Sequence, residues 1–189
     1  PHKVFDARVL PLADLQASRA LVPGATVNDV VLAVCAGALR RYLMAKQALP
    51  VQPLVAFMPV SMRAAQDVPA GGNQVFAVLC SLASEQADPS QRFAAIKASA
   101  KAAKVQFSEQ SMETTHQHIL LLGGLLLLIQ QLGVSARVAP PANVVISNVP
   151  GPRQALYLNG AKLVAQYPLS MLIDGLALNI TITSHADNL

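Results

Sequence analysis

The sequence predicts an α/β fold in which helices flank a mixed β-sheet. Segments with the apolar period of a helix and segments typical of strands both occur along the 189 residues. These segments do not strictly alternate, so the sheet should be mixed rather than built from repeated strand–helix units. The length is sufficient for one domain with a sizeable hydrophobic core.

Two helices have recognisable starts. Thr26 can cap the amide of Asp29 while the Asp29 carboxylate caps Thr26 in return, which predicts a helix that continues to about Lys46. A second helix is expected at Asp88-Pro89, because Asp is a good N-cap and proline suits the first turn. One side of this second helix should consist of Phe93, Ile96 and Ala100.

A third helix is expected from about Ser111 to Leu132. It contains eleven consecutive apolar residues, 119–129, whereas crossing a bilayer takes about 20, so the helix should be buried or interfacial. Gly123 and Gly124 interrupt this run at a cost of about 1 kcal/mol each relative to alanine. The pair leaves room either for another helix or for a ligand chain.

The expected strands are apolar or alternating segments bounded by turn residues. The β-branched run Val144–Ile146 should end at Ser147-Asn148, and the rigid corner Pro150-Gly151-Pro152 follows it. Asn159-Gly160 predicts a hairpin. The hairpin arms are expected at 154–158 and 161–165, and the other strands at 53–60, 74–82 and 176–183.

The composition indicates which partners to expect. The chain is 53% hydrophobic and only 13% charged, about half the usual charged fraction, so some apolar surface should face a second domain, a partner or lipid. The net charge is +4, but the basic residues are dispersed, which argues against nucleic acid and leaves phosphate-bearing ligands or anionic lipid open. Cys35 and Cys80 lie in apolar runs and are expected in the core.

Known catalytic spacings are missing from the sequence. It has no nucleophile elbow, no phosphate-binding loop, no metalloprotease motif and no dinucleotide fingerprint. His116 and His118 are two residues apart on an expected helix and so do not share a face, which argues against a metal-binding pair. No metal site is expected. His185 beside Asp187 could orient a base, although such surface pairs are common.

Polar residues nevertheless recur at strand ends and helix starts. Such groups can hold a thioester carbonyl or a pantetheine arm against apolar walls. Each one can equally be a helix cap or a turn residue, above all Asn28 and Asp29, because the first turn of a helix favours both. The set consists of Asn28, Asp29, Ser61, Arg63, Asn73, Ser147, Asn148 and Arg153.

Several segments taken together resemble one family, the bacterial wax ester synthase/acyl-CoA:diacylglycerol acyltransferases (WS/DGAT), in its C-terminal half. The resemblance covers nearly the whole chain. It implies a chloramphenicol-acetyltransferase-like fold, shared by CoA-dependent acyltransferases and condensation domains, with residues 1–189 as the C-terminal half of a two-domain enzyme. The segments are 24–33, 58–63, 71–75, 143–153, 156–160 and 178–181.

The resemblance also implies a mechanism that this chain cannot complete alone. The family's His-His-x-x-x-Asp-Gly motif supplies the general base from the N-terminal half and is absent here, and Asp174-Gly175 lacks the preceding histidines. The base would take the proton of a fatty alcohol or a diacylglycerol hydroxyl, whose oxygen attacks acyl-CoA. The products are a wax ester or triacylglycerol and free CoA. Acyl-CoA is the co-substrate, and no further cofactor is implied.

Site residues follow from the same resemblance. Asn28 and Asp29 should approach the catalytic centre, where Asn28 donates to the developing oxyanion or orients the base. Lys97, Lys101 and Lys104 either meet CoA phosphates or anionic lipid, or form a solvated helix face. The remaining residues expected to bind substrate are Ser147, Asn148 and Arg153 near the centre, and Gly123, Gly124 and Met171 in an acyl or alcohol pocket.

The expected setting is cytoplasmic, with peripheral association at the inner membrane or at lipid inclusions. The partners would be the N-terminal half of the enzyme, acyl-CoA, and a fatty alcohol or diacylglycerol. Two other functions remain open from the sequence. One is a non-catalytic module that binds acyl-CoA or lipid, and the other is a condensation-like domain that uses carrier-bound acyl groups.

Overall fold

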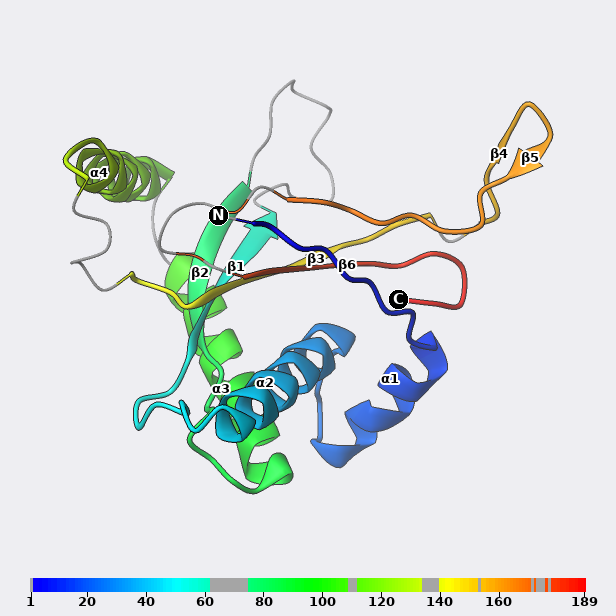
Figure 1. Cartoon of the computed structure of the whole chain (residues 1–189), viewed down its shortest axis with the longest axis horizontal. Coiled ribbons are helices and arrows are strands. Elements are labelled where there is room, and N and C mark those ends of the chain that lie inside the picture. The colour runs from blue at the N-terminus through cyan, green and yellow to red at the C-terminus, as the bar shows by residue number, and fades with distance from the viewer. Residues whose placement is uncertain are drawn as a thin grey trace.

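A mixed four-stranded sheet forms the centre of the molecule (Figure 1). The computed structural model describes residues 2–61, 75–108, 112–133, 140–152, 154–170, 172, 176 and 178–189. The strand order is β2-β1-β3-β6, with β1 antiparallel to β2, and with β1–β3 and β3–β6 parallel. The strands are β1 (Val55–Ser61), β2 (Val75–Ser81), β3 (Val144–Val149) and β6 (Asn179–Thr183).

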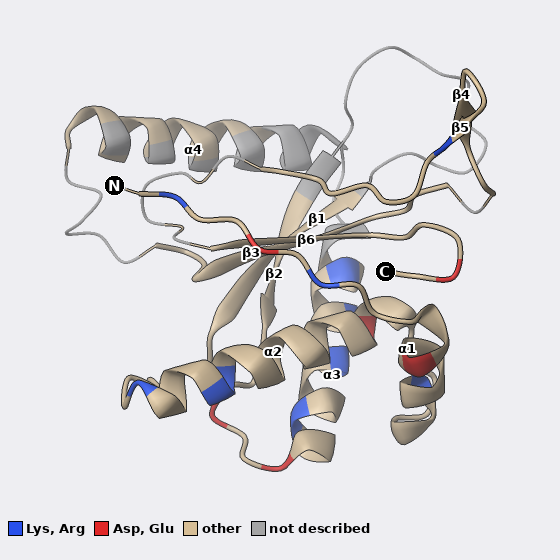
Figure 2. Ribbon diagram, turned by 45° about the vertical axis from the view of Figure 1, so that its right-hand side comes forward, with Lys and Arg blue, Asp and Glu red and all other residues tan. Residues whose placement is uncertain are grey.

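Helices flank this sheet, which confirms the predicted arrangement. Figures 1 and 2 show α1, α2 and α3 on one side of the sheet and α4 on the other. A short 3-10 helix, Arg19–Leu21, joins α1 to the loop before α2. The helices are α1 (Leu12–Ser18), α2 (Val27–Ala45), α3 (Pro89–Ser108) and α4 (Met112–Gln131).

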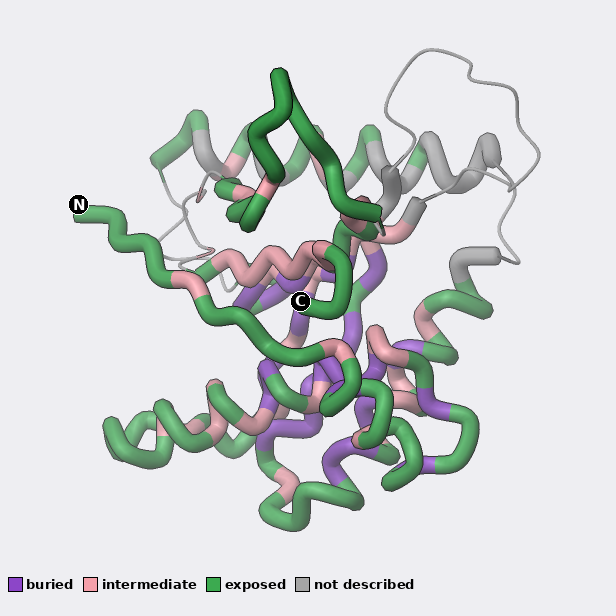
Figure 3. Tube along the Cα trace, turned by 90° about the vertical axis from the view of Figure 1, so that its right-hand side faces the viewer, coloured by how far each residue is buried: buried purple, intermediate pink, exposed green. Residues whose placement is uncertain are grey.

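The hydrophobic core lies between the sheet and helices α2 and α3, where Figure 3 shows the buried segments. Both free cysteines, Cys35 and Cys80, are buried there, which confirms their predicted place in the core. The predicted apolar side of α3 is confirmed as well. Phe93, Ile96 and Ala100 are all buried.

The predicted helix starts are confirmed in detail. Thr26 Oγ1 accepts a hydrogen bond from the Asp29 amide at 3.2 Å, and Asp29 Oδ2 accepts one from the Thr26 amide at 2.8 Å. This reciprocal capping box fixes the first turn of α2. At α3, Asp88 Oδ1 accepts from the Gln91 amide at 2.8 Å.

Several predicted strand boundaries are wrong. β3 does not end at Ser147-Asn148 but continues to Val149, because β6 pairs with it in register through Ser147–Thr181 and Asn148–Ile182. The hairpin forms around Asn159-Gly160, both with positive φ, but its strands are only two residues long. They are β4 (Tyr157–Leu158) and β5 (Ala161–Lys162).

Helix α4 is not buried by the described chain, which excludes the first of the two expected alternatives, a buried helix, within that part of the chain and leaves the interfacial one. Its outward side presents leucines that are between 51% and 75% exposed. In the described residues, no helix combines the length and the hydropathy that crossing a membrane requires. The exposed leucines in α4 and directly after it are Leu120, Leu121, Leu125, Leu127, Leu128 and Leu132.

Candidate functional site

Asn28 lies in the first turn of α2, against the side of the sheet that α2 and α3 cover. It is half-buried, and its Nδ2 donates to Met58 Sδ at 3.6 Å, while Met58 itself is buried on β1. A thioether is a weak acceptor, so this contact holds the amide only loosely. No other side-chain hydrogen bond of Asn28 occurs within the described residues. The amide is therefore positioned by the helix and still able to donate to a ligand.

Asp29 serves a different purpose in the structure. Its side chain is 5% exposed, and Oδ2 accepts from both the backbone amide and the hydroxyl of Thr26, at 2.8 and 2.7 Å. These contacts match the capping alternative that the sequence left open. Asp29 thus fixes the helix start that carries its neighbour Asn28.

The end of β3 sends its two polar residues to opposite faces of the sheet. Side chains alternate along a strand, so Asn148 points to the same side of the sheet as Ile146. Ile146 belongs to the core, so this is the side that α2 and α3 cover. Asn28 and Met58 lie on that same side. Ser147 points the other way, beside its register partner Thr181. The structure therefore places Asn28 and Asn148 on one face and separates Ser147 from them.

The proline corner after β3 is held tightly against the end of β6. The Gly151 amide donates to Ser184 Oγ at 2.9 Å, and the Ala186 amide donates to the Pro152 carbonyl at 3.2 Å. A Cβ at position 151 would lie 1.8 Å from the Ser184 carbonyl oxygen, so no other residue fits. This corner forms a fixed rim beside the carboxyl ends of β3 and β6.

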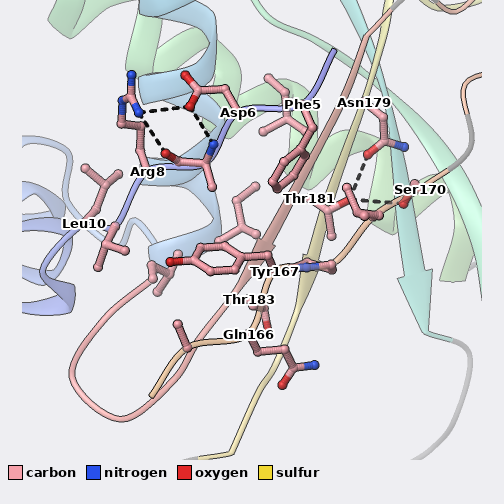
Figure 4. Close-up of a pocket in the computed structure, with 18 of the residues that line it drawn as sticks. Phe5, Asp6, Arg8, Leu10, Gln166, Tyr167, Ser170, Asn179, Thr181 and Thr183 are labelled. Atoms are coloured by element: carbon pink, nitrogen blue, oxygen red, sulfur yellow. Dashed lines mark hydrogen bonds and ion pairs between the residues drawn. The ribbon is translucent and has the colours of Figure 1, made fainter. Parts of the chain in front are cut away.

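A groove of about 780 Å³ runs along β6 and was missed by the sequence reasoning (Figure 4). Its walls are the N-terminal segment 2–10, segment 164–170 and part of α2. Polar side chains meet there, since Thr181 Oγ1 donates to Asn179 Oδ1 at 2.8 Å and lies 3.3 Å from Ser170 Oγ. The alternation of β6 could have indicated this polar side, because Asn179, Thr181 and Thr183 all fall on it.

The backbone of β6 is also unpaired on the groove side. The Val145 amide donates to the Leu178 carbonyl, and in a parallel ladder alternate residues bond to the same neighbour. The N–H and C=O groups of Asn179, Thr181 and Thr183 therefore point away from β3. Within the described chain no backbone hydrogen bond reaches them, so β6 is an open edge.

His185 connects two segments near the groove rather than forming a pair with Asp187. Its Nε2 lies 3.0 Å from the Leu163 carbonyl oxygen, and its Nδ1 is buried without a partner in the described chain. Among the described residues the ion pair found is Arg8–Asp6, and His185 and Asp187 form none. The arrangement does not present His185 as a general base.

The two cysteines are unsuited to nucleophilic chemistry. Burial raises the pKa of the Cys35 thiol to about 11, even though a backbone hydrogen bond works in the opposite direction. Burial also raises the pKa of Cys80, which a hydrogen bond with Ser99 partly offsets. Both thiols stay protonated near neutral pH, and the thiolate is the reactive form.

The other expected site residues contribute less in the described chain. Nothing lies within 4 Å of a Cβ placed on Gly123 or Gly124, so neither a helix nor a pocket wall meets them there. Lys97 Nζ donates to the Pro23 carbonyl and supports the loop before α2. Four residues lie outside the described ranges, namely Arg63, Asn73, Arg153 and Met171.

Comparison with solved structures first defines the class of fold. The chain matches the wax ester synthase/diacylglycerol acyltransferase from Marinobacter aquaeolei VT8 with a TM-score of 0.77 and 38% identity. The match covers 96% of this chain and 40% of that one. The architecture is therefore that of the CoA-dependent acyltransferases, which confirms the predicted fold class.

Sequence comparison then gives the family. Residues 71–189 match the WS/DGAT C-terminal domain. A Mycobacterium tuberculosis protein named a putative diacylglycerol O-acyltransferase is 50% identical over 166 residues, which is 88% of this chain and 37% of that protein. The O-acyltransferase WSD of Acinetobacter baylyi is 44% identical over 87% of this chain and 35% of its own length. The chain belongs to the WS/DGAT family, and it spans less than two fifths of these two relatives.

Proposed function

We propose that this chain is the C-terminal half of an O-acyltransferase. The complete enzyme would transfer a fatty acyl group from acyl-CoA to a long-chain alcohol, giving a wax ester, or to diacylglycerol, giving triacylglycerol. Membership in the WS/DGAT family carries this proposal, since the relatives are named for such transfers. The relatives' greater length supports a separate N-terminal half that supplies the general base.

Asn28 has the clearest role in this chain. The base of the other half would remove the hydroxyl proton of the acceptor, and the oxygen would attack the thioester carbon. Negative charge then develops on the carbonyl oxygen, and a positioned N–H donor stabilises it. Asn28 Nδ2 fits this role because the α2 capping box fixes its backbone and, among the described residues, only Met58 Sδ accepts one of its two hydrogens.

The exposed leucines of α4 support a peripheral location. An apolar helix surface of this kind suits either the other half of the enzyme or the surface of the inner membrane or a lipid inclusion. Gly123, Gly124 and Met171 would line an acyl or alcohol pocket once the other half is present. Asn148 and Arg153 would shape the acceptor side, whereas Ser147 would have to act from the opposite face of the sheet. Acyl-CoA would be the co-substrate, with no additional cofactor.

Replacement of Asn28 in the full-length polypeptide tests the proposal. Asn28→Ala should lower kcat with acyl-CoA and a fatty alcohol at least about tenfold, or 1.4 kcal/mol of barrier, with little change in KM. Gln16→Ala is the matched control, because it removes an exposed helical amide that makes no contact with the site. Unchanged kcat in a variant with a normal melting temperature would remove Asn28 from the site.

The acyl donor distinguishes the remaining functions. Turnover with acyl-CoA is expected, whereas turnover only with acyl-carrier protein would indicate a condensation-like enzyme. Tight acyl-CoA binding without any transfer, by a full-length polypeptide lacking paired histidines, would indicate a binding module.

A further inference from the structure

A second cavity, of about 560 Å³, lies between the second half of α2 and the start of α3. It is lined by Arg40, Arg41 and Arg92, with Gly37 and Pro89 among the other lining residues. Figure 2 shows Lys and Arg residues on α2 and α3 on this side of the molecule, and acidic residues in the loop beside them. Neither the family resemblance nor the proposed acyl transfer gives these arginines a role.

Arg92 is the most buried of the three arginines, with 8% of its surface exposed. Its Nη1 donates to the carbonyls of Gln86 and Ala87 at 2.7 and 3.3 Å, and Arg40 Nη1 donates to the carbonyl of Ser84. The loop before α3 therefore holds both guanidinium groups in place. A guanidinium has five N–H donors, and these contacts use only Nη1 of each. The donors on Nε and Nη2 have no partner in the described chain.

The charge of this cluster is not balanced by the described residues. No carboxylate there lies within ion-pair distance of Arg40, Arg41 or Arg92. Burial lowers the pKa of Arg92, the neighbouring charge of Arg40 lowers it further, and Asp88 offsets only part of this. Asp88 is itself engaged as the N-cap of α3. Arginine is seldom this buried without an anionic partner, so the cluster is suited to an added counter-ion.

The geometry favours phosphate as that counter-ion. Guanidinium groups present a planar fork that matches phosphate oxygens, and a phosphate monoester carries close to two negative charges. Arg92 Nη2 lies beside α2, since a Cβ at Gly37 would be in van der Waals contact with it at 3.6 Å. The volume is in the range of small-ligand sites and leaves room for a group attached to the phosphate.

We propose that the cavity formed by Arg40, Arg41 and Arg92 binds the phosphate group of a phosphorylated ligand. Two sources present this chemistry to the enzyme, namely the phosphates of CoA and the headgroup of an anionic phospholipid. Of the three lysines first considered for such a group, Lys97 is instead bonded to the Pro23 carbonyl. Phosphate binding here does not depend on the proposed acyl transfer.

Titration of the full-length polypeptide with inorganic phosphate tests the site. Arg41→Gln is the main variant, because Arg41 is exposed and makes no hydrogen bond in the described chain, so folding should be unaffected. We expect its Kd for phosphate to rise about fivefold to tenfold, and that of Arg92→Gln to rise further, because charge-assisted contacts are lost. Lys162→Gln is the control, because it removes a cation on the distant β5 strand and should leave the Kd unchanged.

Two further probes identify the source of the phosphate. Weaker binding of dephospho-CoA than of CoA, with the difference abolished in Arg41→Gln, would assign the site to CoA. Loss of binding to phosphatidylglycerol vesicles in Arg41→Gln would assign it to lipid. Phosphate affinity that is unchanged in Arg41→Gln, or lowered equally by Lys162→Gln, would overturn the proposal. Asn28→Ala should retain phosphate binding, so failure of the acyl-transfer proposal can be told from failure of this one.

Discussion

Two glycines of this chain have different structural roles. At Gly151 the backbone of Ser184 comes so close that a side chain would overlap the carbonyl oxygen. At Gly124, in the exposed part of α4, a Cβ would meet nothing within 4 Å. The first glycine is required by a close approach, whereas the second only weakens a helix.

Alanine at these two positions should therefore have effects of opposite sign. Gly151→Ala should lower the free energy of unfolding by about 1–3 kcal/mol, because the corner must move away from Ser184. Gly124→Ala should raise it by up to about 1 kcal/mol through helix propensity. Urea unfolding of both variants checks this. A stable Gly151→Ala protein would show that the corner is not clamped.

The raised pKa of Cys35 makes stability depend on pH in the alkaline range. The thiol titrates near 9.0 in the unfolded chain and near 11 in the folded one, so below pH 9 both states hold the proton. Between these values the unfolded state releases its proton first, and stability falls as pH rises. The loss should reach roughly 2 kcal/mol. Cys35→Ala should lose less stability than the parent between about pH 8 and pH 10.5, and equal losses would contradict the assignment.

At the scale of the element, the start of α2 links stability to the candidate site. The Thr26–Asp29 capping box sets the first turn, and Asn28 is part of that turn. Sequence was sufficient to predict this start, because a capping box depends only on residues three positions apart. It was equally sufficient for the start of α3 and for the Asn159-Gly160 turn.

Removal of the Thr26 cap tests whether the start of α2 affects both stability and the position of Asn28. Thr26→Ala should lower the free energy of unfolding by about 1 kcal/mol, because two contacts with Asp29 are lost. It should also lower kcat in the full-length polypeptide less than Asn28→Ala does. Ser18→Ala, which loses an exposed hydroxyl contact at the end of α1, is the control and should change both quantities little. An effect of Thr26→Ala on kcat larger than that of Asn28→Ala would argue that the cap, not the amide, matters for catalysis.

Other elements could not be predicted from local sequence. Helix α1 has no side-chain cap and buries only Leu15, so its start and its period are both weak. The length of β3 depends on β6, which lies about thirty residues further along the chain. The groove along β6 and the arginine cavity arise from segments far apart in sequence, and no spacing rule brings such segments together.

At the scale of the whole molecule, charge and apolar surface are separated. Helices α2 and α3 carry six cationic side chains, namely Arg40, Arg41, Arg92, Lys97, Lys101 and Lys104, whereas the described side chains of α4 are uncharged and leucine-rich (Figure 2). The low charged fraction of the sequence predicted exposed apolar surface. It could not predict where that surface lies, because position depends on how the chain folds.

The open edge of β6 has a practical consequence for work with this chain in isolation. Within the described chain, the outward backbone groups of Asn179, Thr181 and Thr183 have no hydrogen-bond partner, so an extended peptide can pair with them. The peptide most abundant in a concentrated sample is a second copy of the same strand. Purification at high concentration therefore favours intermolecular sheets and precipitation. Expression together with the proposed N-terminal half, or a lysine placed on the edge, should keep the protein in solution.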